Sequence, residues 1–568
     1  MKLRYLKSLT ALTACLMLCA SVHAVPIRRQ PGIHIPEYLM PTDRDDPALW
    51  TSQSPYMFNR AAATPGAYAT TDIPRTGEKE YPLVLVNFQD LHFFEKDTAA
   101  LLRHYECVFN EHGYPDSIRF IYKETKYRPP VGSVSDYFHD QSYGKYKPTF
   151  KIIGPITVSQ GYAYYGSGVY DNVRPLVKEV LDTIIARNLA DISGYARNGM
   201  IDQISIIYAG RGENYGGADP KTIWPQAGIA YFDRNDAKIY GKGIRRAKYA
   251  CSAELFFDSD SLYDGIGTFC HEFSHTLGLP DFYNTENNHS DEESSSNNYD
   301  AAMGYWSLMD YGCYENGGFC PVGYTAFEKY SLGWLELEEI SGPGTLILRD
   351  ISQTPDPESG IHTAYRLNTG DDSQFLILEN HIKTGWYRHH RSRGLMVTAV
   401  DYNQDRWIGN QANNGSTWGY HILPADNNYD VYTSSGDLYP YKRTDSLGVT
   451  HIVDSITTKG EPQLKAGTSY PSFSIYDITL DSNYRLSFNV RYDLPTEVKE
   501  TPKQEISIDV FDGKLTVCAP SGSRIQVYDI SGKPVSQVTA TSAVQQITLP
   551  GHGIWIVKCG NKTRKVRL

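Results

Sequence analysis

The stretch HEFSHTLGLPD, which begins at His271, constrains the fold of this chain more than any other. Residues four apart lie on the same face of an α-helix, so His271 and His275 can present both imidazoles to one metal ion. Gly278 stands where a helix often ends in a left-handed residue, and Pro280 cannot simply continue a helix. The stretch therefore predicts a helix that carries two metal ligands and then turns sharply, so that Asp281, or a residue farther on, can supply a third.

The residue types in this stretch are those of a zinc hydrolase. A catalytic zinc needs neutral nitrogen ligands, an open coordination position for water and a base that accepts a proton from that water. Glu272, which follows the first histidine, is the candidate base. The alternative is a surface helix whose histidines are solvated, but a chance match is rare once Gly and Asp are required at the eighth and eleventh positions. We therefore expect one catalytic Zn²⁺, bound by His271, His275 and Asp281.

A second short stretch, YWSLMDYG at residues 305–312, follows the predicted helix by about thirty residues. Zinc peptidases of the metzincin type place a methionine turn beneath the metal, downstream of an extended HExxHxxGxx motif. Met309 would form that floor, and Tyr311 could hydrogen-bond the metal-bound oxygen or the developing oxyanion. The alternatives are a core methionine and a core tyrosine whose hydroxyl is satisfied elsewhere. Together with Gly278, which would shape the turn, Met309 is expected to support the site.

Several domains are expected, because 568 residues exceed what one hydrophobic core usually serves. Candidate strands at 81–88 and 204–210 alternate with candidate helices at 133–141, capped by Ser133, and at 172–189, which favours mixed α/β layers. Beyond residue 343 the pattern changes to strands and turns, which indicates all-β, sandwich-like domains. The predicted parts are a signal peptide (1–24), a pro-segment or N-terminal arm (25–79), a catalytic domain (80–338), a β-rich domain (339–494), a linker (495–505) and a small β-sandwich (506–568).

The first 24 residues predict export. Three basic residues precede position 8, residues 8–20 form a short apolar core, and Val22-His23-Ala24 supplies small residues at the spacing of a cleavage site. The apolar run is shorter than the roughly 20 residues that a membrane-spanning helix needs, and no later segment is long and apolar enough to span. We therefore expect a secreted or surface-attached protein without a transmembrane segment in its mature form.

Charge and cysteine content narrow the function further. A net charge of −11 and a pI of about 5.8 argue against nucleic acid as the main partner. Seven of the nine cysteines follow residue 24, and an odd number leaves at least one thiol unpaired in a monomer. Cys313 with Cys320, and Cys518 with Cys559, are candidate disulfides on proximity and domain grounds. No cysteine pair has the CxxC spacing of a structural zinc site, so none is assigned a catalytic role.

The stretches GTFCHEFSHTLGLPDFY, WSLMDYG and GYTAFEKYSLGW resemble the catalytic domain of the immune inhibitor A-like family of secreted zinc metallopeptidases. The upstream stretches YPLVLVNFQD, SVSDYF, SYGKYKPTF and AGRGENYGGADPKTIWP are similar to that family's pattern as well. The resemblance covers roughly residues 80–338 and implies a zincin-type endopeptidase made as a zymogen. It implies His271, His275 and Asp281 as zinc ligands and Glu272 as the catalytic base. Activation would need a cleavable bond near the domain boundary, where the basic candidates are Arg75 and Lys79.

The last 63 residues, with IQVYDISGKPV, ITLPGHGIWIVKCG and the basic end RKVRL, resemble the C-terminal sorting domain of type IX secretion substrates. The resemblance implies the type IX secretion machinery as a partner, followed by removal of the domain and release or surface attachment. The alternative is a β-sandwich adhesin or carbohydrate-binding module, since a small β module does not by itself specify a function.

Two further expectations stay open. The Asn/Asp/Glu-rich loop 284–300 is a candidate for Ca²⁺ binding, with a solvated loop as the alternative. The leading function is a protein-cleaving zinc endopeptidase that uses a metal-activated water with Glu272 as general base. The competing function is a surface binding or adhesin protein on a catalytically silent peptidase scaffold. Glu272 favours the enzyme, because a purely structural zinc site needs no carboxylate beside its ligand.

Overall fold

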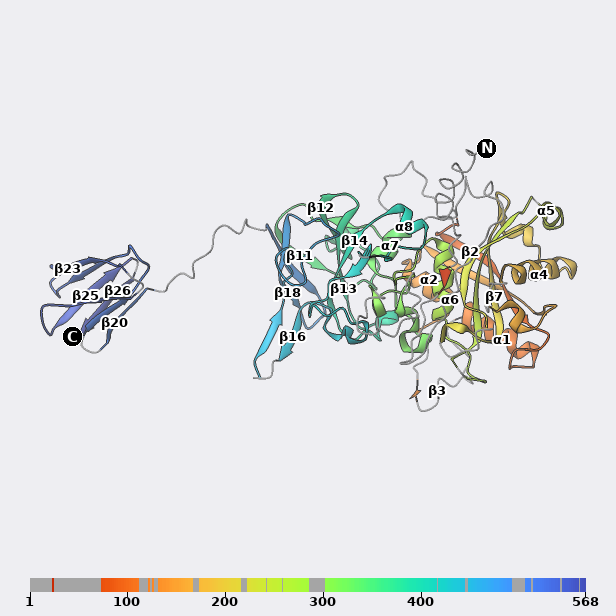
Figure 1. The fold of residues 1–568 in the computed structure, drawn as a ribbon, viewed down its shortest axis with the longest axis horizontal. Helices are drawn as coiled ribbons and strands as arrows, with labels where there is room; N and C mark the ends of the chain where they lie inside the picture. The colour runs from red at the N-terminus through yellow and green to blue at the C-terminus, as the bar shows by residue number, and fades with distance from the viewer. Residues whose placement is uncertain are drawn as a thin grey trace, which may run out of the picture. The chain divides into compact units, whose positions relative to one another are not determined.

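A computed structural model describes residues 23–24, 73–111, 121–122, 125–126, 131–166, 173–215, 222–241, 243–257, 259–285, 302–415, 417–444, 448–492, 506–511, 514–541, 544–560 and 562–567. The chain divides into two compact units, Met1–Asp493 and Leu494–Leu568 (Figure 1). Most of the predicted signal peptide and pro-segment, the acidic loop from residue 286 and the predicted linker lie outside the described residues.

A seven-stranded mixed sheet forms the centre of the region before residue 339, which contains the predicted catalytic domain and is called the catalytic part below. The strand order is β1-β8-β9-β7-β2-β5, with β6 beside β7. β5, β2, β7 and β9 run parallel, whereas β8 is antiparallel to β9 and to β1. Parallel strands are buried on both faces, which explains the continuous apolar run at residues 83–86. The bounds are β1 (His23–Ala24), β2 (Gly77–Asn87), β5 (Tyr146–Thr157), β6 (Ala196–Arg197), β7 (Met200–Arg211), β8 (Gln226–Tyr231) and β9 (Arg246–Leu255).

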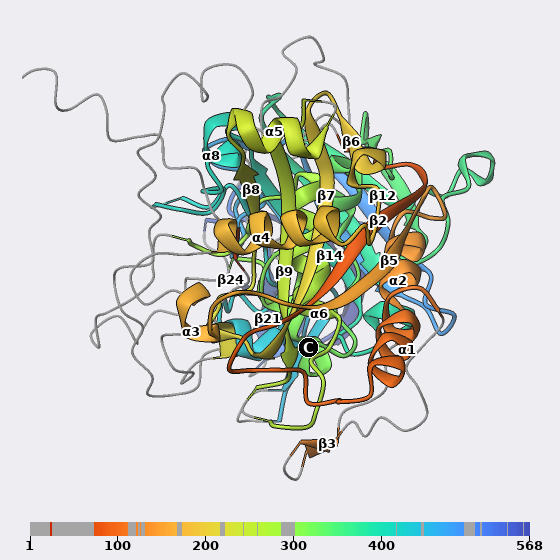
Figure 2. The ribbon, with the colours of Figure 1, turned by 90° about the vertical axis from the view of Figure 1, so that its right-hand side faces the viewer.

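Helices cover both faces of this sheet. Figures 1 and 2 show α4 on one face and α6 on the other. The predicted cap Ser133 is confirmed, because its hydroxyl accepts the amide of Asp136, whose carboxylate accepts the amide of Ser133 in return. The bounds are α1 (Thr98–Phe109), α2 (Val134–Gln141), α3 (Tyr162–Tyr165), α4 (Val173–Ala186), α5 (Arg234–Tyr240), α6 (Gly267–Leu277) and α7 (Ala326–Ser331), with the small hairpin β3 (Ile121–Tyr122) and β4 (Thr125–Lys126). The mixed α/β prediction is confirmed for this part.

A β-rich part follows within the same unit. It contains a five-stranded sheet β10-β12-β13-β14-β15, a three-stranded sheet β11-β19-β18 and the hairpin β16-β17. The bounds are β10 (Glu338–Glu339), β11 (Gly344–Leu348), β12 (Ala364–Asp371), β13 (Gln374–His381), β14 (Gly394–Asp401), α8 (Gln404–Ile408), β15 (Tyr420–Ile422), β16 (Tyr441–Thr444), β17 (Thr450–Val453), β18 (Phe473–Leu480) and β19 (Leu486–Tyr492).

The strands β13 and β14 of the five-stranded sheet are buried on both faces. Side chains alternate across a strand, so Phe375 and Ile377 of β13 join the core of the catalytic part, while Leu376 and Leu378 join the core of the β-rich part. One hydrophobic cluster therefore continues from the catalytic part into the β-rich part without a break at residue 339.

The second unit consists of two antiparallel sheets, β20-β21-β24 and β23-β22-β25-β26. Strands of both sheets contribute to one hydrophobic cluster, with Val517 from the first sheet and Val527 and Val557 from the second. A β-sandwich remains the prediction for this unit. The bounds are β20 (Ser507–Phe511), β21 (Lys514–Cys518), β22 (Arg524–Tyr528), β23 (Pro534–Thr539), β24 (Val544–Ile547), β25 (Ile554–Cys559) and β26 (Lys562–Arg567).

The predicted disulfides are wrong. None of the seven cysteines that the structure describes forms a disulfide. Cys313 and Cys320 are both buried in the catalytic core, and Cys518 and Cys559 lie on strands of two different sheets. Proximity in sequence therefore did not indicate pairing.

The two basic candidates for activation lie in ordered backbone. The Arg75 guanidinium donates to Ser331 O at 3.2 Å, and the Trp334 indole N–H donates to Arg75 O at 2.7 Å. Lys79 lies within β2, paired with Pro148 of β5. Within the described part of the chain, none of the helices has the length and apolar character that crossing a membrane requires.

Candidate metal centre

Helix α6 carries the HExxH stretch through the middle of the protein, and every one of its residues is buried. It ends at Gly278, whose φ of 107° is the left-handed conformation that glycine adopts without steric cost. The amides of Gly278 and Leu279 both donate to Ser274 O, at 3.1 and 3.2 Å, which satisfies the end of the helix. The chain then reverses, as predicted, and brings Asp281 back to the two histidines.

The three predicted ligands converge. His271 Nε2 and His275 Nε2 lie 3.1 Å apart, and Asp281 Oδ1 lies 3.1 Å from the first and 3.2 Å from the second. These residues are the one group of at least three His, Cys, Asp or Glu side chains in the described ranges whose ligand atoms gather closely enough to hold a metal ion. Ligands of a tetrahedral zinc at about 2.0–2.1 Å lie roughly 3.3 Å from one another. The triangle therefore has nearly the size that zinc requires.

Hydrogen bonds behind the imidazoles fix which nitrogen faces the centre. His271 Nδ1 donates to Leu308 O and His275 Nδ1 donates to Leu279 O, each at 2.8 Å. A carbonyl oxygen can only accept, so the proton of each neutral ring resides on Nδ1 and the lone pair is on Nε2. Burial lowers the pKa of His275, which keeps that ring neutral and able to bind a metal.

Asp281 completes a cluster of three acceptors. It is fully buried, and its Oδ1 receives no hydrogen bond from a donor of the described residues. Burial by itself would raise the pKa of Asp281, but the neighbouring His275 and His271 outweigh it and lower that pKa below its ordinary value. Two nitrogen lone pairs and a carboxylate oxygen facing one another in a dry site repel unless a cation lies between them. The donor set thus fits a divalent metal.

Glu272 is fully buried on the same helix, next to the first histidine. Its charge helps to raise the pKa of Tyr283, after the larger effects of burial and Asp281. The Glu272 carboxylate thus interacts electrostatically with a side chain of the loop that carries Asp281.

The WSLMDYG stretch contacts both His271 and the loop that carries Asp281. His271 binds its Leu308 carbonyl, and the amide of Phe282 donates to Met309 O at 2.8 Å. Met309 is fully buried, and Asp310 fixes the turn by accepting the amides of Met303, Gly304 and Tyr311 at 2.8–3.1 Å. The turn thus touches both the α6 ligand and the loop of the third ligand.

Besides Tyr311, a second tyrosine that was not predicted lies in the motif region. Tyr311 begins the 3₁₀ segment η6 (Tyr311–Gly318), and its ring centroid lies 6.0 Å from that of Tyr305. Tyr283, which follows Asp281 by two residues, makes a side-chain hydrogen bond to the Asp281 carboxylate. Sequence reasoning missed Tyr283, although its place in the motif loop was available as a signal.

Sequence reasoning also missed Asn410. Its side-chain amide donates to Asp281 Oδ2 at 2.6 Å, and its Oδ1 accepts the Asp281 amide at 2.7 Å. Asn410 follows α8 in the β-rich part, 129 residues from the ligand it touches. No pattern near the motif could have indicated this contact.

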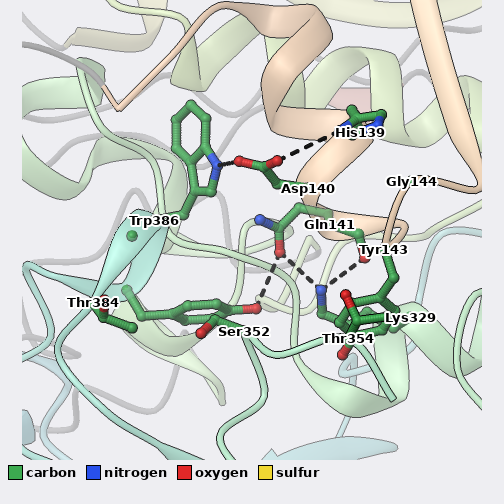
Figure 3. Close-up of a pocket in the computed structure, with 12 residues that line it drawn as sticks. His139, Asp140, Gln141, Tyr143, Gly144, Lys329, Ser352, Thr354, Thr384 and Trp386 are labelled. Atoms are coloured by element: carbon green, nitrogen blue, oxygen red, sulfur yellow. Dashed lines mark hydrogen bonds and ion pairs between the residues drawn. The ribbon is translucent and has the colours of Figure 1, made fainter. Parts of the chain in front are cut away.

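A cavity of about 370 Å³ lies elsewhere in the first unit, and none of the predicted metal ligands lines it (Figure 3). Its wall includes the buried Lys329, whose Nζ donates to Gln141 O at 2.7 Å and to Gln141 Oε1 at 3.1 Å. The same Nζ lies 4.4 Å from the centroid of the Tyr143 ring. Across the cavity, the Trp386 indole N–H donates to Asp140 Oδ2 at 2.9 Å. Residues of α2, of α7 and of the β-rich part all line the cavity.

Comparison with known proteins agrees with this geometry. Residues 76–339 match the family model of the immune inhibitor A peptidase M6 catalytic domain. Pre-pro-metalloprotease PrtV of Vibrio cholerae serotype O1 is 26% identical over 294 residues, 45% of this chain and 30% of PrtV. Immune inhibitor A of Bacillus thuringiensis subsp. alesti is 26% identical over 231 residues, 35% of this chain and 31% of that protein.

These matches show that residues 76–339 are similar to the M6 metallopeptidase catalytic domain. The aligned regions span about 30% of the relatives' own length. A chain from the solved structure of PorZ, described as a surface component of the type-IX secretion system of Porphyromonas gingivalis, is 11% identical with a TM-score of 0.11. It covers 38% of this chain and 41% of its own length, an overlap too poor to bear on the fold.

Proposed function

We propose that this chain is a secreted zinc-dependent endopeptidase that hydrolyses peptide bonds of proteins. The observation that carries the proposal is the buried triangle of His271 Nε2, His275 Nε2 and Asp281 Oδ1, with edges of 3.1–3.2 Å. It is supported by the match of the surrounding residues to the M6 catalytic domain.

Each residue of the centre has a distinct part in the proposed reaction. His271, His275 and Asp281 would hold the ion; three protein ligands are one fewer than a tetrahedral zinc binds, as in catalytic sites that keep one position for water. When bound, zinc supplies a Lewis acid that makes a water acidic near neutral pH and polarises a peptide carbonyl. Glu272 accepts the proton as the water attacks that carbonyl, and then delivers it to the departing amine.

Other residues orient the reacting groups. Met309 would form the floor together with Leu308: the Met309 carbonyl accepts the Phe282 amide and the Leu308 carbonyl accepts His271 Nδ1–H, while Gly278 allows the turn that returns Asp281. We propose that the Tyr311 hydroxyl stabilises negative charge on the substrate oxygen. Tyr311→Phe should then lower kcat by about 100- to 1000-fold with unchanged zinc content, whereas the neighbouring Tyr305→Phe should not.

The cellular route is proposed from the sequence. The chain would be exported through residues 1–24, kept latent by the segment 25–79 and directed by residues 506–568 to the type IX secretion machinery. Release or surface attachment would follow removal of that last unit.

The deciding experiment measures casein cleavage by the purified protein, both full-length and lacking the residues before Ile73. Glu272→Gln and 1,10-phenanthroline are the two controls, and zinc content is determined on the same samples. We expect about one zinc per chain, with turnover lost in Glu272→Gln but zinc retained. Zinc without cleavage of broad substrates would favour the silent binding protein, and a folded protein without zinc would refute the proposed centre.

A further inference from the structure

The three ligands differ in how firmly the local chain holds them. His271 and His275 project from the buried helix α6, whose backbone fixes their separation. Asp281 lies beyond the end of that helix, on the loop that begins at Gly278. A carboxylate on a loop has more conformational freedom than a side chain on a buried helix. Its position must therefore be fixed by contacts from outside the loop.

Asn410 supplies such a contact with both ends of its amide. The Asn410 Nδ2–H donates to Asp281 Oδ2 at 2.6 Å, and Asn410 Oδ1 accepts the Asp281 backbone amide at 2.7 Å. Only one orientation of the amide satisfies both bonds, since a carboxylate can only accept and a backbone amide can only donate. The pair fixes Oδ2 and leaves Oδ1 facing the two histidines. Tyr283 adds a hydrogen bond to the same carboxylate, but from the same loop.

The segment that follows Asn410 holds the rest of the loop. Asn413 Nδ2 donates to Phe282 O at 2.7 Å, and Asn414 Oδ1 accepts the Thr285 amide at 2.8 Å. The Thr285 hydroxyl donates in turn to Asn410 O at 3.0 Å. Residues 410–414 thus bind the loop at the positions of residues 281, 282 and 285, and we call them the asparagine clamp.

The asparagine clamp is itself rigid. Asn410 is 3% exposed and has a φ of 56°, a conformation that asparagine tolerates better than most residues. The backbone N–H of Asn410 donates to Trp407 O at 3.2 Å. The Trp407 indole packs against the Phe282 and Phe327 rings, with a centroid distance of 5.7 Å to each. The clamp is therefore anchored in the core that the catalytic and β-rich parts share.

We propose that Asn410 is a positioning residue for the metal centre, and that the asparagine clamp makes the β-rich part a structural component of the peptidase site. The family match ends at residue 339, so this support comes from outside the matched region. The inference rests on the proposed zinc centre. Outer partners of metal ligands typically change metal affinity by 10- to 100-fold when they are removed.

The test uses the full chain and measures zinc affinity by competition with a chromophoric chelator. Asn410→Gly removes both hydrogen bonds while permitting the positive φ, and Asn410→Asp places a carboxylate against Asp281. The matched control is Asn427→Gly, since Asn427 is exposed and has the same φ of 56°. We expect the zinc Kd to rise at least tenfold for both Asn410 variants and to stay unchanged for the control.

A second readout separates positioning from loss of fold. The visible spectrum of the Co²⁺-substituted protein should change in Asn410→Gly, while its far-UV circular dichroism matches that of the wild type. A zinc Kd within twofold of the wild type together with an unaltered Co²⁺ spectrum would overturn the inference and leave the proposed function intact. Equal losses in Asn427→Gly would also overturn it, whereas failure of the wild type to bind zinc would refute the proposed function itself.

Discussion

Gly267, the first residue of α6, is the position where one added methyl group should disturb the metal centre most directly. A Cβ built there lies 1.9 Å from the Cys313 carbonyl oxygen, about 1.5 Å closer than the 3.4 Å of ordinary contact. The obstacle is backbone, so no side-chain rotation relieves it. Cys313 lies in η6, directly after the turn that binds His271 through Leu308 O. Relief of the clash must therefore separate α6 from the segment that orients its first ligand.

Two effects of Gly267→Ala oppose each other. Alanine is favoured over glycine within a helix by about 1 kcal/mol. Overpacking of a well-packed core costs about 1–3 kcal/mol, occasionally more, and a clash with fixed backbone belongs at the upper end. We therefore expect a net loss of about 2 kcal/mol in the free energy of unfolding. For a unit of several hundred residues this corresponds to a fall in Tm of roughly 1–4 °C.

The assay is differential scanning fluorimetry of Gly267→Ala and Gly194→Ala beside the wild type. Gly194 lies in the 3₁₀ segment η2 (Ile192–Tyr195), and a Cβ there meets nothing within 4 Å. Gly194→Ala should leave Tm unchanged or raise it slightly. A Tm for Gly267→Ala at or above that of the wild type would show that helix propensity outweighs the clash, and would refute this reasoning.

Three further outcomes are expected. Burial lowers the pKa of Lys329 from 10.5 to about 7, so between pH 7 and about 10 the unfolded chain binds a proton that the folded chain lacks. The stability of the wild type relative to Lys329→Met should therefore rise with pH across that window. Tm measured for both proteins from pH 6.5 to 9.5 would show it. Thiol titration in denaturant without reductant should give seven thiols for a chain that begins at Val25, and a lower value would reveal disulfides. Ser133→Ala removes the cap of α2 and should lower the free energy of unfolding by about 1 kcal/mol, whereas Ser133→Asp should restore most of it.

The local part of the site was predictable because its geometry is local. A spacing of four residues places His271 and His275 on one helical face, and Gly278 with Pro280 marks the end of that helix. The recurrence of apolar residues at helical spacing likewise predicted α4, whose buried residues extend from Val173 to Ile184. In each case the residues that determine the helix and its ends lie within one short stretch of sequence.

Contacts between distant segments were not predictable in this way. The Leu308 carbonyl that orients His271 lies 37 residues downstream, and Asn410 lies 129 residues beyond Asp281. Gly267 reads as a weak helix former in sequence, and the need for glycine there is evident only from the approach of Cys313 O. The same limit explains the wrong disulfides, since closeness of Cys313 and Cys320 in sequence does not determine the geometry that a bridge needs.

This difference between local and distant contacts explains why the two histidines and Asp281 are held in different ways. A helix can fix two ligands with its own hydrogen bonds, but two imidazoles alone leave the position of a third ligand free. The third ligand must come from a loop, and the entropy lost on ordering a loop has to be offset by packing and hydrogen bonds from elsewhere. Asn410 and Trp407 provide them from the β-rich part, and Leu308 and Met309 from the turn below. A metal site built on the HExxH helix is thus only as well ordered as the distant segments that close around its loop.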